Sequence, residues 1–169
     1  MTIAIVFGTF APMHLGHMDV IKAAAEENDR VIVVCCGHEG DRGYPKLPLE
    51  MRYRYAKEAV RDITGYVLCF PDTDPDVKAD WTAEQIWYYW LEKMKITMTE
   101  ERMIDYFNDE LIWYTAEPDY IRLITASGHK VRQLERVRNI SATFIRNDPG
   151  AYADAVIPPF DEAFKEDLR

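Results

Sequence analysis

The sequence predicts an α/β protein in which five parallel strands, in the order 3-2-1-4-5, form a doubly wound sheet with helices on both faces. Two observations support this fold class. Apolar runs such as 3–7 and 30–36 have no polar face, as strands that are buried on both sides require. Segments with helical periodicity separate these runs, and alternating strands and helices form right-handed parallel crossovers. We therefore expect the first and fourth strands to be adjacent at the centre.

Apolar periodicity and turn residues place the remaining elements. Strands are expected at 66–70, 111–114 and 130–134. Helices are expected at 18–27, 49–62, 81–95, 100–107, 119–127 and 158–168, and Gly128 ends the fifth of them. A Gly- and Pro-rich loop, 37–48, leaves the carboxyl end of the second strand, which is the edge where open α/β sheets bind ligands.

The turn between the first strand and the first helix, Gly-Thr-Phe-Ala-Pro-Met-His-Leu-Gly-His at 8–17, is the most informative stretch. Gly8 and Gly16 allow the backbone to approach a ligand closely, and the start of a helix offers unpaired N–H groups to an anion. His14 and His17 are three residues apart, so both rings face the same space. Backbone amides and two imidazoles together predict a cradle for a polyphosphate.

Two alternatives apply to these histidines. They could be exposed polar side chains without a function, or half of a metal site. Zinc requires four ligands, and Cys35 and Cys36 are neighbours on a predicted strand, so their side chains point to opposite faces. No His-Glu-x-x-His pattern is present either, and we therefore favour the phosphate cradle over a metal site.

A second motif, Ile-Ser-Ala-Thr-Phe-Ile-Arg at 140–146, lies near the other end of the chain. Ser141 is a good helix N-cap, and the amides that follow it can face an anion. Arg146 supplies a planar, permanently charged fork that suits phosphate oxygens. Alone, this motif would describe an ordinary capped surface helix.

Bulk properties indicate one soluble domain over 1–169. The formal net charge of −9 and the pI of about 4.9 argue against a nucleic acid or an acidic membrane as partner. The three cysteines, two of them adjacent, do not form a disulfide framework and suit a reducing compartment. No leader segment and no apolar run of membrane-spanning length is present, so we expect a cytoplasmic protein.

The two motifs resemble the (His/Thr)-x-Gly-His and Ile-Ser-x-Thr-x-Ile-Arg signatures of the nucleotidylyltransferase superfamily, which has a Rossmann-like fold. Further blocks at 40–43, 47–55, 114–118 and 138–149 resemble the nicotinamide-mononucleotide (NMN) adenylyltransferase domain of bacterial NadR-type proteins. That domain makes NAD and pyrophosphate from ATP and NMN. NadR-type proteins commonly add DNA-binding and kinase domains. This chain starts at the first strand and has no Gly-x-x-x-x-Gly-Lys-Ser/Thr loop, so we expect neither.

The resemblance implies in-line attack of the NMN phosphate on the α-phosphorus of ATP, without a covalent intermediate, and with Mg²⁺ bridging the ATP phosphates without dedicated protein ligands. The residues implied for ATP are Gly8, Thr9, Phe10, His14, His17, Ser141, Thr143 and Arg146. Those implied for NMN are Thr9, Phe10, Arg42 and Trp81. His14, His17, Arg42 and Arg146 would act in catalysis by stabilising charge.

Arg42 and Trp81 each have a second interpretation. Arg42 would neutralise the attacking phosphate, or it would be a surface arginine paired with Asp41. Trp81 would stack on the cationic nicotinamide ring, because its helix follows the loop at the ligand-binding edge of the sheet, or it would only cap that helix. The tryptophans at 87 and 90 fit a core-facing stripe of the same helix.

Other functions stay open. A pantetheine-phosphate adenylyltransferase or a glycerol-phosphate cytidylyltransferase shares both motifs, although the NadR-like blocks argue against these. A non-catalytic sensor that binds ATP or NAD is the alternative from another class. The sequence leaves open whether the amide or the acid form of the mononucleotide is preferred, and whether the chain forms a homo-oligomer.

Overall fold

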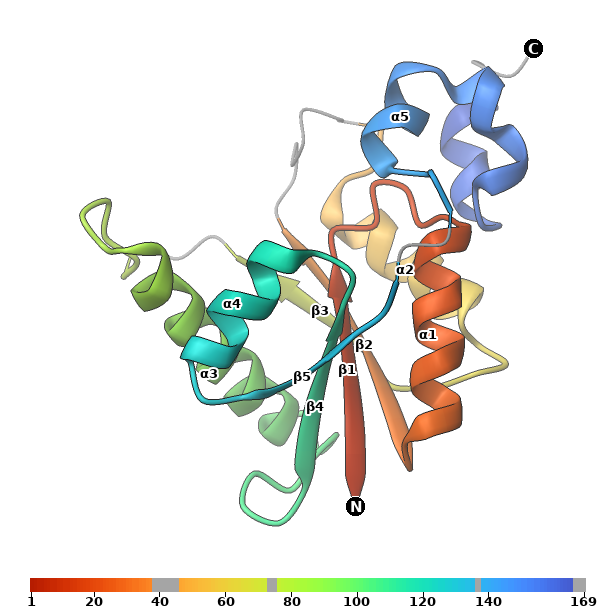
Figure 1. The fold of residues 1–169 in the computed structure, drawn as a ribbon. Coiled ribbons are helices and arrows are strands. Elements are labelled where there is room, and N and C mark those ends of the chain that lie inside the picture. The colour runs from red at the N-terminus through yellow and green to blue at the C-terminus, as the bar shows by residue number, and fades with distance from the viewer. Residues whose placement is uncertain (38–45, 73–75, 136–137, 166–169) are drawn as a thin grey trace.

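The computed structural model describes residues 1–37, 46–72, 76–135 and 138–165, and its strands form one parallel sheet (Figure 1). The strands are β1 (Thr2–Gly8), β2 (Arg30–Gly37), β3 (Val67–Pro71), β4 (Glu110–Thr115) and β5 (Lys130–Gln133). Their order in the sheet is β3-β2-β1-β4-β5, and every neighbouring pair is parallel. The predicted fold class and strand order are confirmed.

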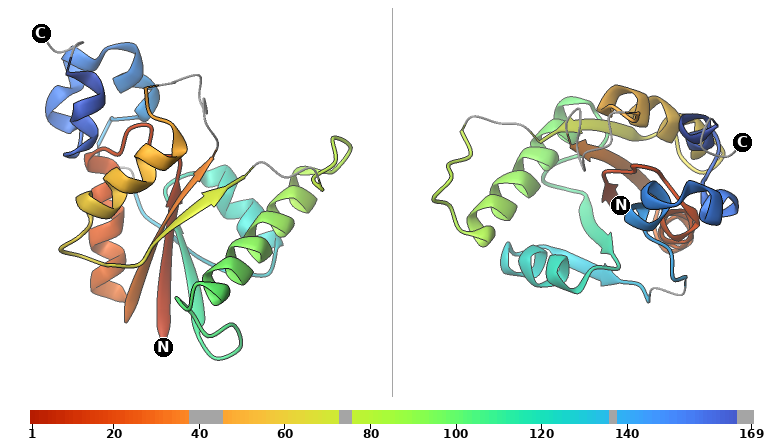
Figure 2. Two further views of the ribbon diagram at one scale, coloured as in Figure 1. Left: turned by 180° about the vertical axis from the view of Figure 1, so that it is seen from behind. Right: turned by 90° about the horizontal axis from the view of Figure 1, so that it is seen from above.

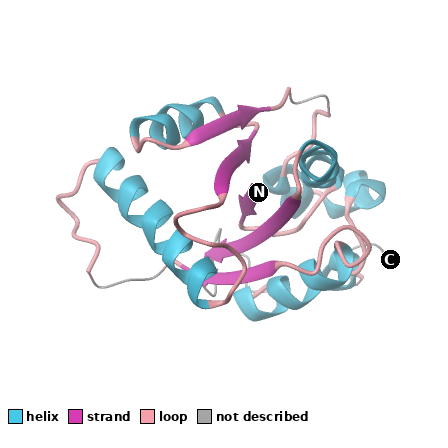
Figure 3. Ribbon diagram, turned by 90° about the horizontal axis from the view of Figure 1, so that it is seen from below, coloured by secondary structure: helices cyan, strands magenta, loops and turns pink. Residues whose placement is uncertain are grey.

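Helices cover both faces of this sheet, as Figures 2 and 3 show. One face carries α1 (Leu15–Glu27) and α2 (Leu49–Ala59), and the other carries α3 (Ala83–Glu100) and α4 (Pro118–Ala126). The carboxyl-terminal elements α5 (Ala142–Asn147), η2 (Pro149–Ala155) and η3 (Phe160–Phe164) lie beside the α1–α2 layer. The path of the chain therefore changes face between β3 and β4.

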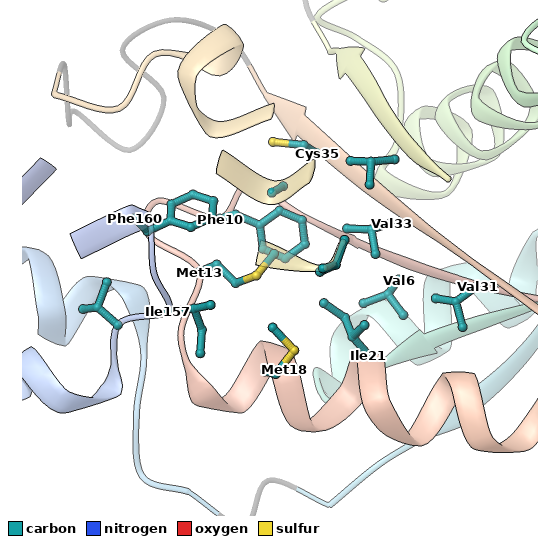
Figure 4. Close-up of a cluster of buried hydrophobic side chains, with 14 of the residues drawn as sticks. Val6, Phe10, Met13, Met18, Ile21, Val31, Val33, Cys35, Ile157 and Phe160 are labelled. Carbon is teal, nitrogen blue, oxygen red and sulfur yellow. The ribbon is translucent and has the colours of Figure 1, made fainter. Parts of the chain in front are cut away.

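Alternation along β1 divides the interior into two cores. Ala4 and Val6 belong to the core under α1 and α2, whereas Ile3 and Ile5 belong to the core under α3 and α4, because successive side chains of a strand point to opposite faces. In the first core, residues of the turn after β1 pack against the carboxyl-terminal segment (Figure 4). This packing seats the turn on the body of the protein.

The predicted short helix over 100–107 is wrong. The preceding helix, α3, continues to Glu100, and the chain then turns through Arg102, whose φ is 58°. The Asp105 side chain accepts the backbone N–H groups of Phe107 and Asn108. Such local bonds offer the backbone an alternative to a helix, and here the alternative prevails.

Most predicted helices have different bounds in the structure; for example, the helix expected over 49–62 ends at Ala59. The helix expected over 81–95 begins at Ala83, because Thr82 and Gln85 form a capping box at its start. The terminal helix expected over 158–168 is a short 3₁₀ helix, η3, and residues 166–169 lie outside the described part of the chain.

Within the described ranges, no helix combines the length and the apolar character that crossing a membrane requires.

Candidate active site

A cleft of about 900 Å³ opens at the carboxyl edge of the sheet, beside the ends of β1 and β4. These two central strands mark the point where the strand order reverses, which is where open α/β sheets bind ligands. The cleft brings together most of the residues that the sequence singled out: Gly8, Thr9, His14, His17, Ser141, Thr143 and Arg146. Side chains from the two ends of the chain thus meet in one place.

His14 and His17 are held in a fixed orientation by backbone hydrogen bonds. His14 is the N-cap of α1, and its Nδ1 accepts the N–H of Gly16 at 3.1 Å. The Nδ1 of His17 accepts the N–H of His14 at 3.1 Å, and the two rings stack with centroids 3.8 Å apart. An Nδ1 that accepts a hydrogen bond places the ring proton on Nε2. Each ring therefore carries its proton on Nε2.

Phe10 supports His17 from the side of the core. Its φ of 51° turns the chain sharply, and its side chain is buried. The ring of Phe10 meets the ring of His17 edge-on, with centroids 5.0 Å apart. The phenyl ring is thus part of the packing beneath the cradle, and the binding role of the Phe10 amide stays a prediction.

Gly16 has no room for a larger side chain. A Cβ at this position would lie 2.9 Å from Cε1 and 3.0 Å from Nδ1 of His14. We expect Gly16→Ala to displace the His14 ring and to lower kcat at least about tenfold, since small misplacements of catalytic donors are costly. Steady-state kinetics checks this, with Gly65→Ala as control, because a Cβ at Gly65 meets nothing within 4 Å. Equal kinetics for both variants would contradict the prediction.

Arg146 connects the second motif to the turn after β1. One terminal nitrogen of its guanidinium donates to the Ala11 carbonyl at 2.8 Å, and the other donates to the Thr143 hydroxyl at 3.1 Å. Ser141 caps α5, because its Oγ accepts the N–H of Phe144 at 3.1 Å. A permanent positive charge therefore lies beside the histidines.

Arg138 and Asp19, for which no role was predicted from the sequence, also line the cleft. Arg138 donates to both carboxylate oxygens of Asp19, at 2.6 and 3.3 Å, and so ties the segment before α5 to α1. These bonds raise the pKa of the Arg138 guanidinium, which stays charged. The only sequence signal for Arg138 was its place at the start of the last NadR-like block.

An aromatic wall faces the histidines across the cleft. This wall consists of three residues that line the cleft, namely Trp87 and Trp90 of α3 and Tyr120 of α4. The rings of Trp87 and Tyr120 are 4.8 Å apart, and both contact Phe7 near the end of β1. Both tryptophans were predicted to face the core, and both pack against it while also lining the cleft.

The structure does not bring Trp81 to the cleft. Trp81 precedes the Thr82 cap of α3, and its ring packs edge-on against Tyr89 at a centroid distance of 5.5 Å. Tyr89 in turn contacts Trp90, so Trp81 is linked to the aromatic wall through Tyr89. The helix begins at Ala83, two residues later than expected, and Trp81 is not among the residues that line the cleft. Arg42 and the block 40–43 lie outside the described residues.

A parallel sheet with a cleft at its switch point is the arrangement found in nucleotide-binding α/β proteins. The profile of the cytidylyltransferase-like family matches residues 5–148 of this sequence. The chain belongs to the cytidylyltransferase-like family, within the nucleotidylyltransferase superfamily that the two motifs indicated.

Curated relatives match part of the chain. A phosphopantetheine adenylyltransferase of Clavibacter michiganensis subsp. michiganensis is 40% identical over 60 residues, which are 36% of this chain and 36% of the relative. A phosphopantetheine adenylyltransferase of Cutibacterium acnes is 33% identical over 69 residues, 41% of this chain and 43% of the relative. The matched segments thus span less than half of these proteins.

Solved structures match nearly the whole chain. A NadR protein in complex with NR superimposes with a TM-score of 0.76 at 28% identity, over 96% of this chain and 45% of that one. A NadR protein in complex with NAD and AMP-PNP gives 0.70 at 27% identity, with the same coverage. A bifunctional NMN adenylyltransferase/ADP ribose pyrophosphatase from Francisella tularensis gives 0.58 at 18% identity, over 86% of this chain and 41% of that one, and supports the fold alone.

Proposed function

We propose that the protein transfers the adenylyl group of ATP to NMN and releases NAD and pyrophosphate. The observation that carries this proposal is one cleft that holds two Nε2–H imidazoles and a guanidinium opposite an aromatic wall. The similarity to NadR proteins bound to NR and to NAD with AMP-PNP supports the choice of nucleotides. The chain spans less than half the length of those proteins, so their other activities are not part of the proposal.

The chemistry needs positioned charge rather than a protein nucleophile. An oxygen of the NMN phosphate forms a bond to the α-phosphorus of ATP, and the bond from that phosphorus to the bridging oxygen breaks, so pyrophosphate leaves. His14, His17 and Arg146 would stabilise the charge on the non-bridging and leaving oxygens. Burial raises the pKa of the nearby Cys35 thiol, so this thiol stays protonated and takes no part as a nucleophile.

The two ends of the cleft suit the two substrates differently. The histidines and Arg146 would hold the ATP phosphates, and the apolar side chains of Leu134 and Ile140, which line the same side, would contact the adenosine. The nicotinamide ring of NMN is flat and cationic, and aromatic faces attract such rings by stacking and cation–π interaction. Trp87 and Tyr120 would therefore take over the role that the sequence suggested for Trp81.

Magnesium would enter with the ATP. Among the residues that the structure describes, no group of three or more His, Cys, Asp or Glu side chains could hold a metal ion. Mg²⁺ in nucleotide sites is commonly bound through substrate phosphates and one or two carboxylates, and Asp19 is the carboxylate that lines the cleft on α1. The ion would neutralise phosphate charge, while the protein side chains orient the phosphates.

The test is a direct assay of acceptors. The protein is incubated with ATP, Mg²⁺ and, in separate reactions, NMN, nicotinic acid mononucleotide or 4′-phosphopantetheine, and with CTP and glycerol 3-phosphate. The products are identified by mass. NAD formed at the highest kcat/KM supports the proposal. Dephospho-coenzyme A as the main product would instead assign the function of the curated relatives, and no product in any reaction would favour a nucleotide sensor.

The aromatic wall makes a separate prediction about the NMN site. We expect Trp87→Ala to raise the KM for NMN several-fold and to change the KM for ATP little, because stacking and cation–π interactions contribute about 0.5–2 kcal/mol. Trp81→Ala is the matched control, since this substitution removes an indole that does not line the cleft. A larger effect from Trp81→Ala on the KM for NMN would restore the original interpretation of Trp81.

A further inference from the structure

Arg52, on α2, is completely buried although arginine carries a permanent charge. Its guanidinium donates to three backbone carbonyls. Nε donates to Leu47 at 2.8 Å, and one terminal nitrogen donates to both Thr9 at 2.6 Å and Cys36 at 3.0 Å. A buried charge with this many charge-assisted bonds defines the relative positions of its partners closely.

The three carbonyls belong to segments that meet at the ligand-binding edge of the sheet. Thr9 lies in the turn that forms the phosphate cradle and lines the cleft. Cys36 also lines the cleft, at the end of β2, whereas Leu47 lies just before α2. Arg52 therefore connects the cradle to both ends of the segment that joins β2 to α2.

The shortest of these bonds orients one peptide group of the cradle. The peptide that joins Thr9 to Phe10 is planar and trans in its usual form, so its N–H points away from its carbonyl. Because the carbonyl of Thr9 points to Arg52, the N–H of Phe10 points away from α2. A charge-assisted bond to the carbonyl also polarises the peptide and strengthens its N–H as a donor.

We propose that Arg52 is a positioning residue for nucleotidyl transfer, which acts on the substrate phosphates through the Thr9–Phe10 peptide. The inference rests on the proposed function. Arg52 would thus contribute to catalysis as well as to stability, because its buried guanidinium also donates to a carbonyl of the cradle. Lysine at this position keeps the charge but lacks the planar fork that reaches several acceptors at once.

The test uses two variants, Arg52→Lys and Arg52→Gln, with Met98→Ala as the matched control. Met98 is completely buried in the core under α3 and α4, and it does not line the cleft. Assays are run well below the unfolding midpoint of every variant, so that loss of folded protein does not contribute. We expect kcat to fall about tenfold in Arg52→Lys and about 10²-fold in Arg52→Gln, with smaller changes in the KM for ATP and NMN.

A spectroscopic readout tests the same inference without turnover. In the ¹⁵N-labelled protein, the amide resonance of Phe10 should shift when Mg²⁺ and a non-hydrolysable ATP analogue are added. Arg52→Gln should change its resonance in the free protein and reduce the shift on addition of the nucleotide, whereas Met98→Ala should change neither.

The outcomes separate the two proposals. If the wild-type protein makes no dinucleotide but the nucleotide analogue shifts the Phe10 amide in an Arg52-dependent way, the proposed function fails and the positioning role stands. If the wild-type protein is active and the Arg52 variants lose no more kcat than Met98→Ala, or if the analogue leaves the Phe10 amide unshifted, the inference about Arg52 is overturned.

Discussion

Replacing His17 by alanine is expected to lower kcat by about 10²- to 10³-fold while the affinity for ATP changes far less, because a preorganised donor at developing charge is worth about 2.7–4 kcal/mol. The Nδ1 of His17 accepts the N–H of His14, and the His17 side chain lines the cleft. Steady-state kinetics together with calorimetric titration of an ATP analogue measures both quantities. His17→Gln should recover part of the rate, because its amide can donate from nearly the place of Nε2.

The control for His17 is His129→Ala. His129 lies on the α3–α4 side, with its ring 5.7 Å from that of Trp113, and it does not line the cleft. Loss of His17 also removes one bond of the α1 capping box, at a cost of about 0.5–2 kcal/mol of stability, so the unfolding midpoint is measured alongside. Near-normal turnover of His17→Ala would reassign this histidine to the structure of the turn.

The second large effect is expected for Arg146. Arg146→Ala removes the guanidinium that joins the Ala11 carbonyl to Thr143, and kcat/KM for ATP should fall about 10²- to 10³-fold. Arg146→Lys should recover only a minor part, because an ammonium group cannot make the two divergent bonds. The assay varies ATP at saturating NMN.

Arg122→Ala provides the comparison for this change. Arg122 forms an exposed ion pair with Glu84 outside the cleft, and such pairs contribute little to stability. Its removal therefore controls for the change in net charge. If Arg146→Ala and Arg122→Ala had the same kinetics, the second motif would not contact the phosphates.

The aromatic residues illustrate where local sequence patterns are insufficient. Position 81 seemed suited to the ligand-binding edge because it follows the loop after β3, yet the Thr82 cap places it before the helix. A stripe at 87 and 90 is typical of a core face, and the same pattern also describes residues that face a cleft at the end of the core. Whether such residues face the core or the cleft depends on how α3 packs against α4. A local sequence pattern does not give this packing.

Arg52 is the clearest residue that sequence reasoning could not assign. An arginine on an amphipathic helix is normally exposed, and its periodicity predicts nothing else. Its burial depends on three carbonyls from separate segments that converge only in the folded chain. The role of His14 as the N-cap of α1 was not predicted either, because histidine is not among the preferred N-cap residues.

The fold class, the strand order and the two motifs of the cleft can be predicted from the sequence alone, because apolar strands that alternate with helices allow few topologies and because Gly, His, Ser and Arg have specific uses at anion sites. The folded structure was needed to show that Trp87 and not Trp81 lines the cleft, and that Arg52 is buried and bonded to the cradle. These features depend on contacts between residues distant in the chain, and local periodicity carries no information about such contacts.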